Sequence, residues 1–296
     1  MSRFEENVRA ILLMSVSQIF LVSNDTLAKL ATATLPIGEV IFIHSVIATL
    51  IVASVVVATG QYRHLSALRG MHLWARTAGD IGATTFYLLA LAHLPLPTVV
   101  TVFQATPFVM TAAAAIFLGE AVGWRRWTAI AVGFAGVLVV VRPGVDTFNF
   151  GLFFILGSIA SVTVRDLTTR QLPPAMRSLL VTGVSAVALM LAGAVIGLFE
   201  SWTMPSVRVV IELGGGAALL IVGSQCLILS LRTGDLSVAA PFRYTVIVWG
   251  TILGFLVWRD VPDLFTILGT VVIIASGIYM FQRERRLARI PSLDEL

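Results

Sequence analysis

Charged residues and cysteine are both scarce in this chain of 296 residues. Only 12% of the residues are charged, and Cys226 is the single cysteine. One cysteine excludes an internal disulfide and a cysteine-based metal cluster. With 57% hydrophobic residues and a mean hydropathy of +0.94, the composition also excludes a soluble globular protein.

The sequence also lacks the motifs of common enzymes. It contains no H-E-x-x-H, no G-x-S-x-G, no aspartate-rich diphosphate motif and no Walker A sequence. Without a Walker A motif, ATP is not expected to be a direct source of energy. We therefore predict that the protein is not an enzyme and uses no cofactor and no metal. An intramembrane enzyme stays as the rival class.

Ten apolar runs follow one another along the chain, and they are about as long as a helix that crosses a bilayer. They are continuous rather than alternating, which favours helices over a β-barrel. The loops between them are short and leave no room for the soluble domain that a receptor or an assembly factor would show. We therefore predict an all-α polytopic membrane protein with ten transmembrane helices. The runs cover residues 8–31, 37–58, 73–93, 97–118, 125–141, 150–170, 178–199, 209–231, 236–257 and 263–281.

The placement of charges predicts the orientation of these spans. Glu5 and Glu6 precede the first run and no cleavage site follows it, so we expect this run to be kept as a span. Most arginines, Arg76 among them, are assigned to the side of the membrane that holds both termini. The positive-inside rule then places both termini in the cytoplasm of a multi-pass protein of the bacterial inner membrane. The opposite side has only Arg142, Arg208 and Arg259.

The ten spans divide into two halves of five. The halves join near Arg142-Pro143-Gly144, a cluster of turn-forming residues. Because five is odd, the second half enters the membrane in the opposite orientation, as in the inverted repeats of many secondary transporters. We predict a first repeat at residues 1–143, a second at residues 144–282 and a basic cytoplasmic tail at residues 283–296. The tail is short and follows a span directly, so no nucleic-acid partner is expected.

Two acid–base pairs lie inside apolar spans at matching positions of the two halves. Asp25 and Lys29 are four residues apart, as are Asp166 and Arg170, so each pair shares one helical face. Ionisable groups within membrane spans usually mark a pathway for a substrate or an ion. The alternative is that Asp25 and Lys29 only neutralise each other while the Lys29 ammonium reaches the outer face.

Short motifs recur in the same order in both halves. The first half carries Arg76, Phe86-Tyr87-Leu88-Leu89-Ala90-Leu91, Pro95, Pro107, Leu118-Gly119-Glu120, Gly133 and Gly136-Val137. The second half carries a looser version with Leu227, Leu231, Ala239-Ala240-Pro241, Gly269 and Gly277-Ile278-Tyr279.

This pattern resembles the EamA domain of the drug/metabolite transporter superfamily over nearly the whole chain. The resemblance implies a ten-helix inner-membrane carrier around a central cavity, and it points to the YddG-type exporters of aromatic and neutral amino acids. The sequence departs from the pattern at the ninth span, where Asp260 replaces the glutamate that closes the fourth span. The proline of the ninth span also comes about five residues early.

Polar residues inside the spans are the candidates for substrate binding. Asn24 and Asp25 are expected to hold a substrate amine or a proton, and Arg243, beside Pro241, to clamp a carboxylate. The alternative for Arg243 is a static ion pair with Asp25 or Asp166. The full candidate set is Asn24, Asp25, His44, Tyr87, Gln104, Thr106, Arg165, Asp166, Arg243, Tyr244 and Trp249.

Glycine and proline inside the spans predict where helices bend or approach one another closely. Static packing is the alternative explanation for small residues in membrane helices. The hinge candidates are Gly79, Gly82, Pro107, Gly214, Gly215, Gly216 and Pro241.

These features together predict a secondary transporter that exports small metabolites by alternating access, with aromatic and neutral amino acids as the favoured substrates. A multidrug carrier, or a carrier of another metabolite with the same fold, is the alternative. The expected partners are a small-molecule substrate and the lipid bilayer. Two halves complete one cavity, so a monomer is expected to suffice. Proton coupling and uniport both stay open.

Overall fold

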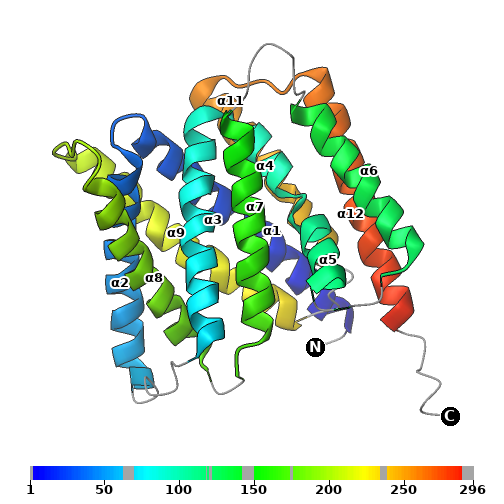
Figure 1. Ribbon diagram of the computed structural model, residues 1–296, viewed down its shortest axis with the longest axis horizontal. Coiled ribbons are helices and arrows are strands. Elements are labelled where there is room, and N and C mark those ends of the chain that lie inside the picture. The colour runs from blue at the N-terminus through cyan, green and yellow to red at the C-terminus, as the bar shows by residue number, and fades with distance from the viewer. Residues whose placement is uncertain are drawn as a thin grey trace. The chain divides into compact units, whose positions relative to one another are not determined.

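Every regular element in the described part of the chain is a helix (Figure 1). The computed structural model describes residues 3–62, 70–117, 119, 122–141, 150–173, 176–233 and 239–288. Within these residues, nine segments are long and apolar enough to cross a membrane. The prediction of an all-α polytopic membrane protein is therefore confirmed.

The helices follow the predicted apolar runs closely. The first half contains α1 (Arg3–Thr32), α2 (Ile37–Ala58), α3 (Met71–His93), α4 (Leu96–Phe103), α5 (Thr106–Phe117) and α6 (Trp124–Val141). The second half contains α7 (Phe150–Arg170), α8 (Ser178–Gly197), α9 (Val207–Thr233), the short 3-10 helix η2 (Ala240–Tyr244), α11 (Thr245–Trp258) and α12 (Leu264–Ala288).

One predicted boundary differs from the structure, and another lies outside the described residues. Helix α12 continues to Ala288, so the predicted tail at residues 283–296 begins as helix. The predicted joint at Arg142-Pro143-Gly144 and the last residues, 289–296, lie outside the described residues, as does the side chain of Arg170.

Helix α3 fills the position of the third predicted span but is not among the nine apolar segments. It contains Arg76 and Asp80 within its first three turns, together with several threonines and glycines, which lower its hydropathy. The count of ten membrane-crossing helices therefore stays a prediction.

The fourth predicted span, residues 97–118, is interrupted rather than continuous. Helix α4 ends at Phe103 and α5 begins at Thr106. Pro107 has no amide hydrogen to donate to the Phe103 carbonyl one turn earlier. The Thr106 hydroxyl donates to that carbonyl instead, at 2.5 Å. The proline predicted to bend this span therefore lies directly after the break.

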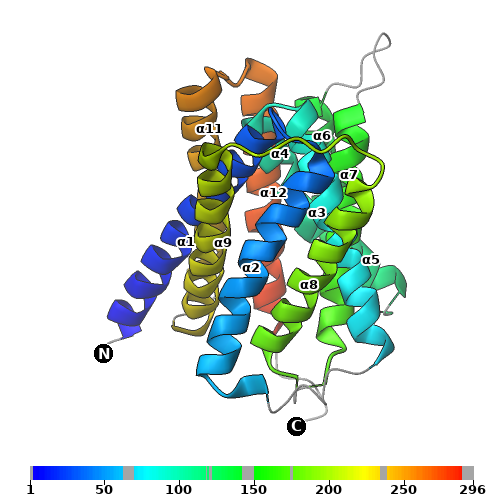
Figure 2. The ribbon, with the colours of Figure 1, turned by 90° about the vertical axis from the view of Figure 1, so that its left-hand side faces the viewer.

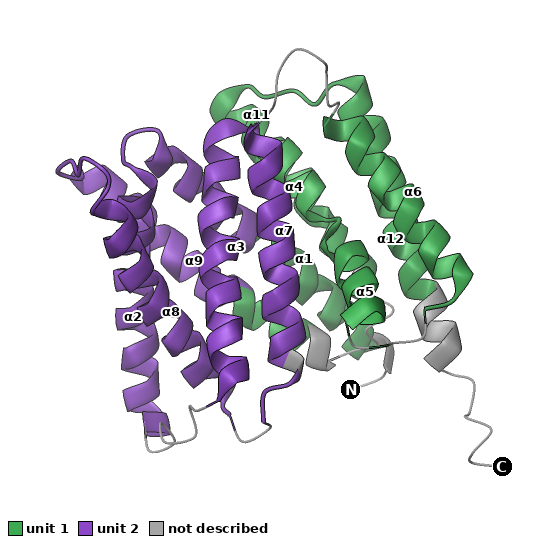
Figure 3. Cartoon of the chain, in the orientation of Figure 1, with its two compact units in different colours: residues 1–19, 96–148, 224–296 green, residues 20–95, 149–223 purple. Residues whose placement is uncertain are grey.

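The described contacts divide the chain into two compact units, and each unit contains segments from both halves of the sequence (Figure 3). Unit 1 comprises residues 1–19, 96–148 and 224–296, and unit 2 comprises residues 20–95 and 149–223. Helices α1 and α9 each contribute one end to each unit.

Inside each unit, helices that hold equivalent positions in the two predicted repeats pack against each other. In unit 2, α2 packs along α8, as Figure 2 shows, and in unit 1 α6 packs on α12 and α4 on α11. Unit 2 also pairs α3 with α7. The reciprocal pair, α1 with α9, meets where Gly216 faces Asn24. A two-fold related duplication would produce this set of pairs, and the inverted repeat itself stays a prediction.

Candidate functional site

A chain of hydrogen bonds joins three helices inside unit 2. Tyr87 of α3 donates its hydroxyl to Asp25 Oδ2 of α1 at 2.8 Å. The Asn24 amide donates to Asp25 Oδ1 at 3.2 Å, and His44 Nε2 of α2 lies 3.1 Å from Asn24 Oδ1. Because an amide oxygen only accepts, the His44 ring is the donor. These four residues form the polar cluster, and each of their side chains is partly exposed.

Glycine on α9 makes room for the polar cluster. A Cβ atom at Gly216 would lie 3.1 Å from Asn24 Oδ1, which is closer than most real Cβ contacts. At Gly214 and Gly215 the nearest atoms would lie at 3.7 Å, an ordinary van der Waals contact. In this structure Gly216 therefore allows α9 to approach the Asn24 amide, while the hinge function of the three glycines stays a prediction.

Lys29 is held at the end of α3. Its ammonium donates to the carbonyl of Leu91 at 2.7 Å and to the carbonyl of Leu94. Carbonyl groups at the last turn of a helix lack partners within the helix and attract cations. The two members of the predicted Asp25–Lys29 pair thus each have other hydrogen-bond partners.

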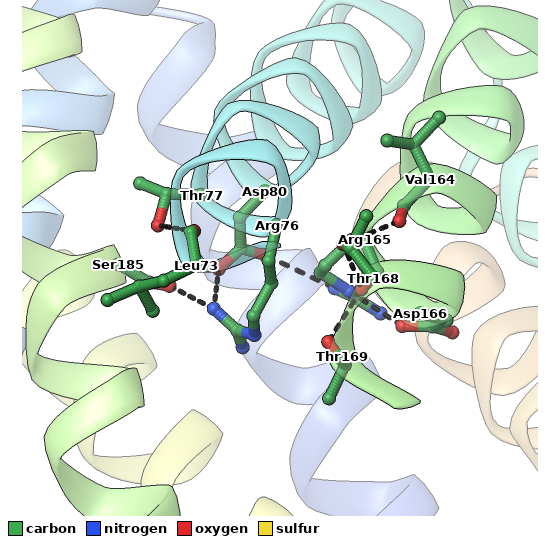
Figure 4. A network of polar contacts seen from close by, with 10 residues as sticks. All are labelled: Leu73, Arg76, Thr77, Asp80, Val164, Arg165, Asp166, Thr168, Thr169 and Ser185. Atoms are coloured by element: carbon green, nitrogen blue, oxygen red, sulfur yellow. Dashed lines mark hydrogen bonds and ion pairs between the residues drawn. The ribbon is translucent and has the colours of Figure 1, made fainter. Parts of the chain in front are cut away.

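A second group of ionisable side chains ties α3 to α7 and α8 (Figure 4). Asp80 is at its centre, with Oδ1 lying 3.3 Å from Arg165 Nη1 and Oδ2 lying 3.6 Å from Arg76 Nη1. Arg165 Nε also donates to Asp166 at 2.9 Å, and Arg76 Nη1 donates to Ser185 of α8 at 2.5 Å. Two arginines and two aspartates make this charge network neutral.

The sequence analysis did not identify Arg76 and Ser185 as partners in this network. The sequence analysis assigned Arg76 to the side of the membrane that holds the termini because its side chain is positively charged. In the structure, Arg76 lies inside α3 beside Asp80. The spacing of four between Arg76 and Asp80 was the available signal, the same spacing that identified the Asp25–Lys29 pair. No sequence signal links Ser185 to it.

Helices α3 and α7 approach each other closely beside the charge network. A Cβ at Gly79 would lie 2.8 Å from the Arg165 backbone nitrogen, and a Cβ at Gly82 would lie 2.8 Å from the Ser161 hydroxyl. One turn further, Ser158 donates to the Ala83 carbonyl at 2.9 Å. These contacts give Gly79 and Gly82 a packing function, and their predicted hinge function has no further support here.

Two glutamates that the sequence analysis passed over link α2 to the segment after α8. Glu39 is 1% exposed and accepts from the Thr203 amide at 3.1 Å, while Glu200 accepts from the Gly38 amide at 2.9 Å. Each carboxylate therefore satisfies a backbone donor of the other segment, which fixes the start of α2 against this connection within unit 2.

The remaining predicted site residues lie in unit 1. Gln104 is buried at the break between α4 and α5, where Thr106 caps the Phe103 carbonyl. Tyr244 lies against α12, because a Cβ at Gly277 would overlap its hydroxyl. The exposed Arg243 and the partly exposed Pro241 lie on η2, and the partly exposed Trp249 lies on α11.

The polar cluster offers the chemistry of a small-molecule site. It combines one carboxylate with an amide, a phenol and an imidazole, so it can accept hydrogen bonds from an ammonium group and donate to a carboxylate. Among the described residues, no group of His, Cys, Asp and Glu is arranged to hold a metal ion.

Comparison with known proteins finds a family match over the first half of the chain. Residues 8–142 match the EamA-like transporter family, which confirms the resemblance that the sequence indicated. A solved crystal structure covers 97% of this chain and 99% of its own, with a TM-score of 0.62 and 18% identity, so the two share a fold.

Three characterised relatives are transporters of small molecules. The S-adenosylmethionine uptake transporter of Rickettsia bellii is 24% identical over 268 residues, covering 89% of this chain and 90% of the relative. The pseudopaline exporter CntI of Pseudomonas aeruginosa is 27% identical over 273 residues, covering 88% and 92%. The riboflavin transporter of Vibrio cholerae is 27% identical over 227 residues, covering 74% of each chain. Uptake and export both occur among them.

Proposed function

We propose that this EamA-like carrier exports small amine-bearing metabolites across the bacterial inner membrane, with aromatic and neutral amino acids as the favoured class. The observation that carries the proposal is the polar cluster of unit 2, in which Asp25 is held by neutral donors between apolar helices. Both termini are proposed to lie in the cytoplasm.

The energetics of a partly exposed carboxylate between apolar helices favour an ammonium as its ligand. A charged side chain in the middle of a bilayer costs about 2.5–3.5 kcal/mol on insertion scales. The Asp25 carboxylate receives hydrogen bonds from Tyr87 and Asn24, which reduce this cost without neutralising the charge. A substrate ammonium would neutralise it. Tyr87 and His44 would contact the rest of the substrate from α3 and α2.

The charge network supports a different function for Arg165 and Asp166. Both were predicted to bind substrate, but their charges are compensated within the network of unit 2. We propose that they mainly hold α7 on α3 near the polar cluster. Direct contact with substrate stays a prediction for both residues.

Within unit 1 taken by itself, Arg243 of η2 is proposed to bind a carboxylate group of a transported metabolite. Its guanidinium is exposed and has the geometry to bind a carboxylate through two parallel hydrogen bonds. Arg243 belongs to unit 1 and Asp25 to unit 2, so their contributions are tested separately. Replacing Arg243 with alanine should reduce the flux of amino acids more than that of amines without a carboxylate.

We further propose that the interrupted helices provide the motion for alternating access. The break before Pro107 and the 3-10 geometry around Pro241 occupy corresponding places in the fourth and ninth predicted spans. Interrupted helices at matching places in two repeats are a feature of secondary transporters.

A carrier of another metabolite is the second candidate. The relatives named for S-adenosylmethionine, pseudopaline and riboflavin show that carriers similar to this chain differ widely in substrate. A site built from one carboxylate and neutral polar groups would also accept larger amines.

Counterflow in proteoliposomes tests the proposal. The purified protein is assayed with the twenty amino acids, S-adenosylmethionine, riboflavin and a set of amines. Aromatic and neutral amino acids should exchange well above protein-free vesicles, and Asp25→Asn should reduce that exchange. Asp263→Asn is the matched control, because Asp263 caps α12 through a side-chain oxygen that asparagine keeps.

The possible results separate the candidates. Exchange of S-adenosylmethionine or riboflavin, without exchange of amino acids, would favour the second candidate. Absence of exchange for every solute, with folded protein in the vesicles, would contradict the carrier assignment.

A further inference from the structure

We propose that the beginning of α6 and the end of α12, both in unit 1, form a binding site for an anionic phospholipid. The site combines arginines that bind the lipid phosphate, two tryptophans at the level of the headgroups and an apolar stripe that an acyl chain covers. This inference goes beyond the proposed function and does not depend on it.

Helix α6 begins with the sequence Trp124-Arg125-Arg126-Trp127, whose aromatic side chains are exposed. Trp124 is 70% exposed and Trp127 is 41% exposed, and Arg125 between them is exposed as well. Tryptophan is enriched where a membrane meets water, because its ring is apolar and its N–H is polar. The pair therefore places the first turn of α6 at the level of the lipid headgroups.

Arg125 contacts an aromatic ring rather than a carboxylate. Its guanidinium carbon lies 5.3 Å from the centre of the Trp124 ring, and among the described residues no carboxylate pairs with it. Arg208 holds the same second position in α9 but is paired with Glu212 at 2.8 Å. A guanidinium that lies over a tryptophan ring still has N–H donors in its plane for the oxygens of a phosphate.

Helices α6 and α12 run antiparallel where they pack. A Cβ at Gly136 would lie 3.0 Å from the Val272 side chain. A Cβ at Gly269 would lie 3.1 Å from the backbone nitrogen of Val140. A step forward along α6 thus corresponds to a step backward along α12, and Figure 1 shows the beginning of α6 and the end of α12 at the same end of the pair.

This arrangement brings more arginines to the level of Arg125. Arg125 lies about three turns before Gly136, and Arg283 lies about three turns after Val272. The last turns of α12 contain Arg283, Arg285 and Arg286, with Glu284 as the one acid of this helix. With Arg125 and Arg126, five arginines and one glutamate belong to the two helix ends. Clusters of about four to eight basic residues next to a membrane helix are typical of sites for anionic lipids.

An apolar stripe runs along α6 from this basic end. The exposed residues of α6 recur every three or four positions and so share one helical face, opposite the face that packs on α12. The stripe consists of Trp124, Trp127, Ala131, Ala135 and Leu138. A free phosphate would use the arginines alone, whereas a phospholipid also covers the stripe with an acyl chain. The stripe is the reason for assigning the ligand as a lipid.

Native mass spectrometry of the purified protein in detergent tests the proposal. Dioleoylphosphatidylglycerol and dioleoylphosphatidylcholine, which have the same acyl chains, are titrated separately. Wild-type protein should bind phosphatidylglycerol more tightly by about tenfold or more, because each arginine near an anionic lipid contributes about fivefold.

Matched arginine variants locate the site. Arg125→Gln should weaken the binding of phosphatidylglycerol by about fivefold and leave the binding of phosphatidylcholine unchanged. Arg208→Gln is the control, because it removes an exposed arginine from the second position of α9 whose charge is paired with Glu212. It should bind both lipids as wild type does. The double variant Arg285→Gln/Arg286→Gln should weaken phosphatidylglycerol in the same way as Arg125→Gln.

Three results would overturn the proposal. The first is equal affinity of wild-type protein for the two lipids, and the second is equal affinity of Arg125→Gln and Arg208→Gln for phosphatidylglycerol. The third is displacement of the lipid by inorganic phosphate at the same concentration, which would show that the stripe contributes nothing. A lipid-free dimer in the same spectra would instead assign the stripe to a second copy of the chain. None of these measurements uses transport, so the inference can fail while the proposed function stands.

Discussion

Asp25 and Asp80 illustrate how the same side chain serves different purposes in one bundle of helices. Asp80 is fixed between Arg76 and Arg165, so its charge is used to hold helices together. Among the described residues, the hydrogen-bond donors to Asp25 are neutral, so Asp25 keeps its charge available for a ligand. The sequence identified Asp25 as a candidate because it lies deep in an apolar run. It could not identify Tyr87 as its partner, because that contact depends on how α1 packs against α3.

A first prediction concerns the centre of the charge network. Asp80→Asn should lower stability by about 2–4 kcal/mol, because both arginines lose a carboxylate while remaining largely buried. Asp166→Asn should cost less, since Asp166 has one arginine partner among the described residues and its side chain is 35% exposed. The melting temperatures of the two variants in detergent, compared with wild type, give the measurement. Equal melting temperatures for both variants would contradict the central position of Asp80.

A second prediction concerns the glycines of α9. Gly216→Ala should slow amino-acid exchange, because the added methyl group would press on the Asn24 amide at 3.1 Å. Gly215→Ala is the matched control, since its methyl group would make only an ordinary contact at 3.7 Å. Exchange rates in proteoliposomes at equal protein density compare the two. A slower rate in Gly215→Ala than in Gly216→Ala would argue against the contact with Asn24.

At the scale of helices, the sequence predicted the positions of the helices well and the interruptions within them only in part. The runs at 37–58 and 150–170 coincide with α2 and α7, because long apolar stretches bounded by polar or turn-forming residues determine where membrane helices lie. Pro107 signalled a bend, but the sequence did not indicate that residues 104 and 105 would leave the helix. That outcome depends on the Thr106 hydroxyl, which satisfies the Phe103 carbonyl.

A third prediction tests whether this break is a hinge. Pro107→Ala restores an amide donor at the break and so allows α4 and α5 to join into one continuous helix. The variant should therefore melt at a higher temperature and exchange amino acids more slowly. Thr111→Ala, one turn further into α5, controls for loss of a side chain from the same helix. A stabilised Pro107→Ala that exchanges at the wild-type rate would remove the hinge function.

At the scale of the whole molecule, the sequence indicated the family and the membrane class but not the grouping of helices. The EamA-like match covers residues 8–142, and its motifs were visible in the sequence. The division into two units that each draw on both halves could not be predicted, because it follows from long-range packing such as that of α2 on α8 and α6 on α12. Small residues allow such close packing, but their spacing does not specify the partner.

A fourth prediction concerns the orientation of the chain in the membrane. In a Cys226→Ala background, a cysteine introduced at Ser201, between α8 and α9, should react with a membrane-impermeant maleimide in intact cells. A cysteine introduced at Leu296 should react only after the cells are opened. This pattern follows from the arginine distribution. Labelling of Leu296→Cys in intact cells would place the C-terminus outside.

Equilibrium binding of a labelled aromatic amino acid to the purified protein tests the central claim most directly. The account predicts saturable binding that weakens by about tenfold or more in Tyr87→Phe and in Asp25→Asn, because each loses a hydrogen bond or charge at the polar cluster. Asp263→Asn should bind as wild type does. Wild-type affinity in both Tyr87→Phe and Asp25→Asn would contradict the claim that the polar cluster of unit 2 holds the substrate.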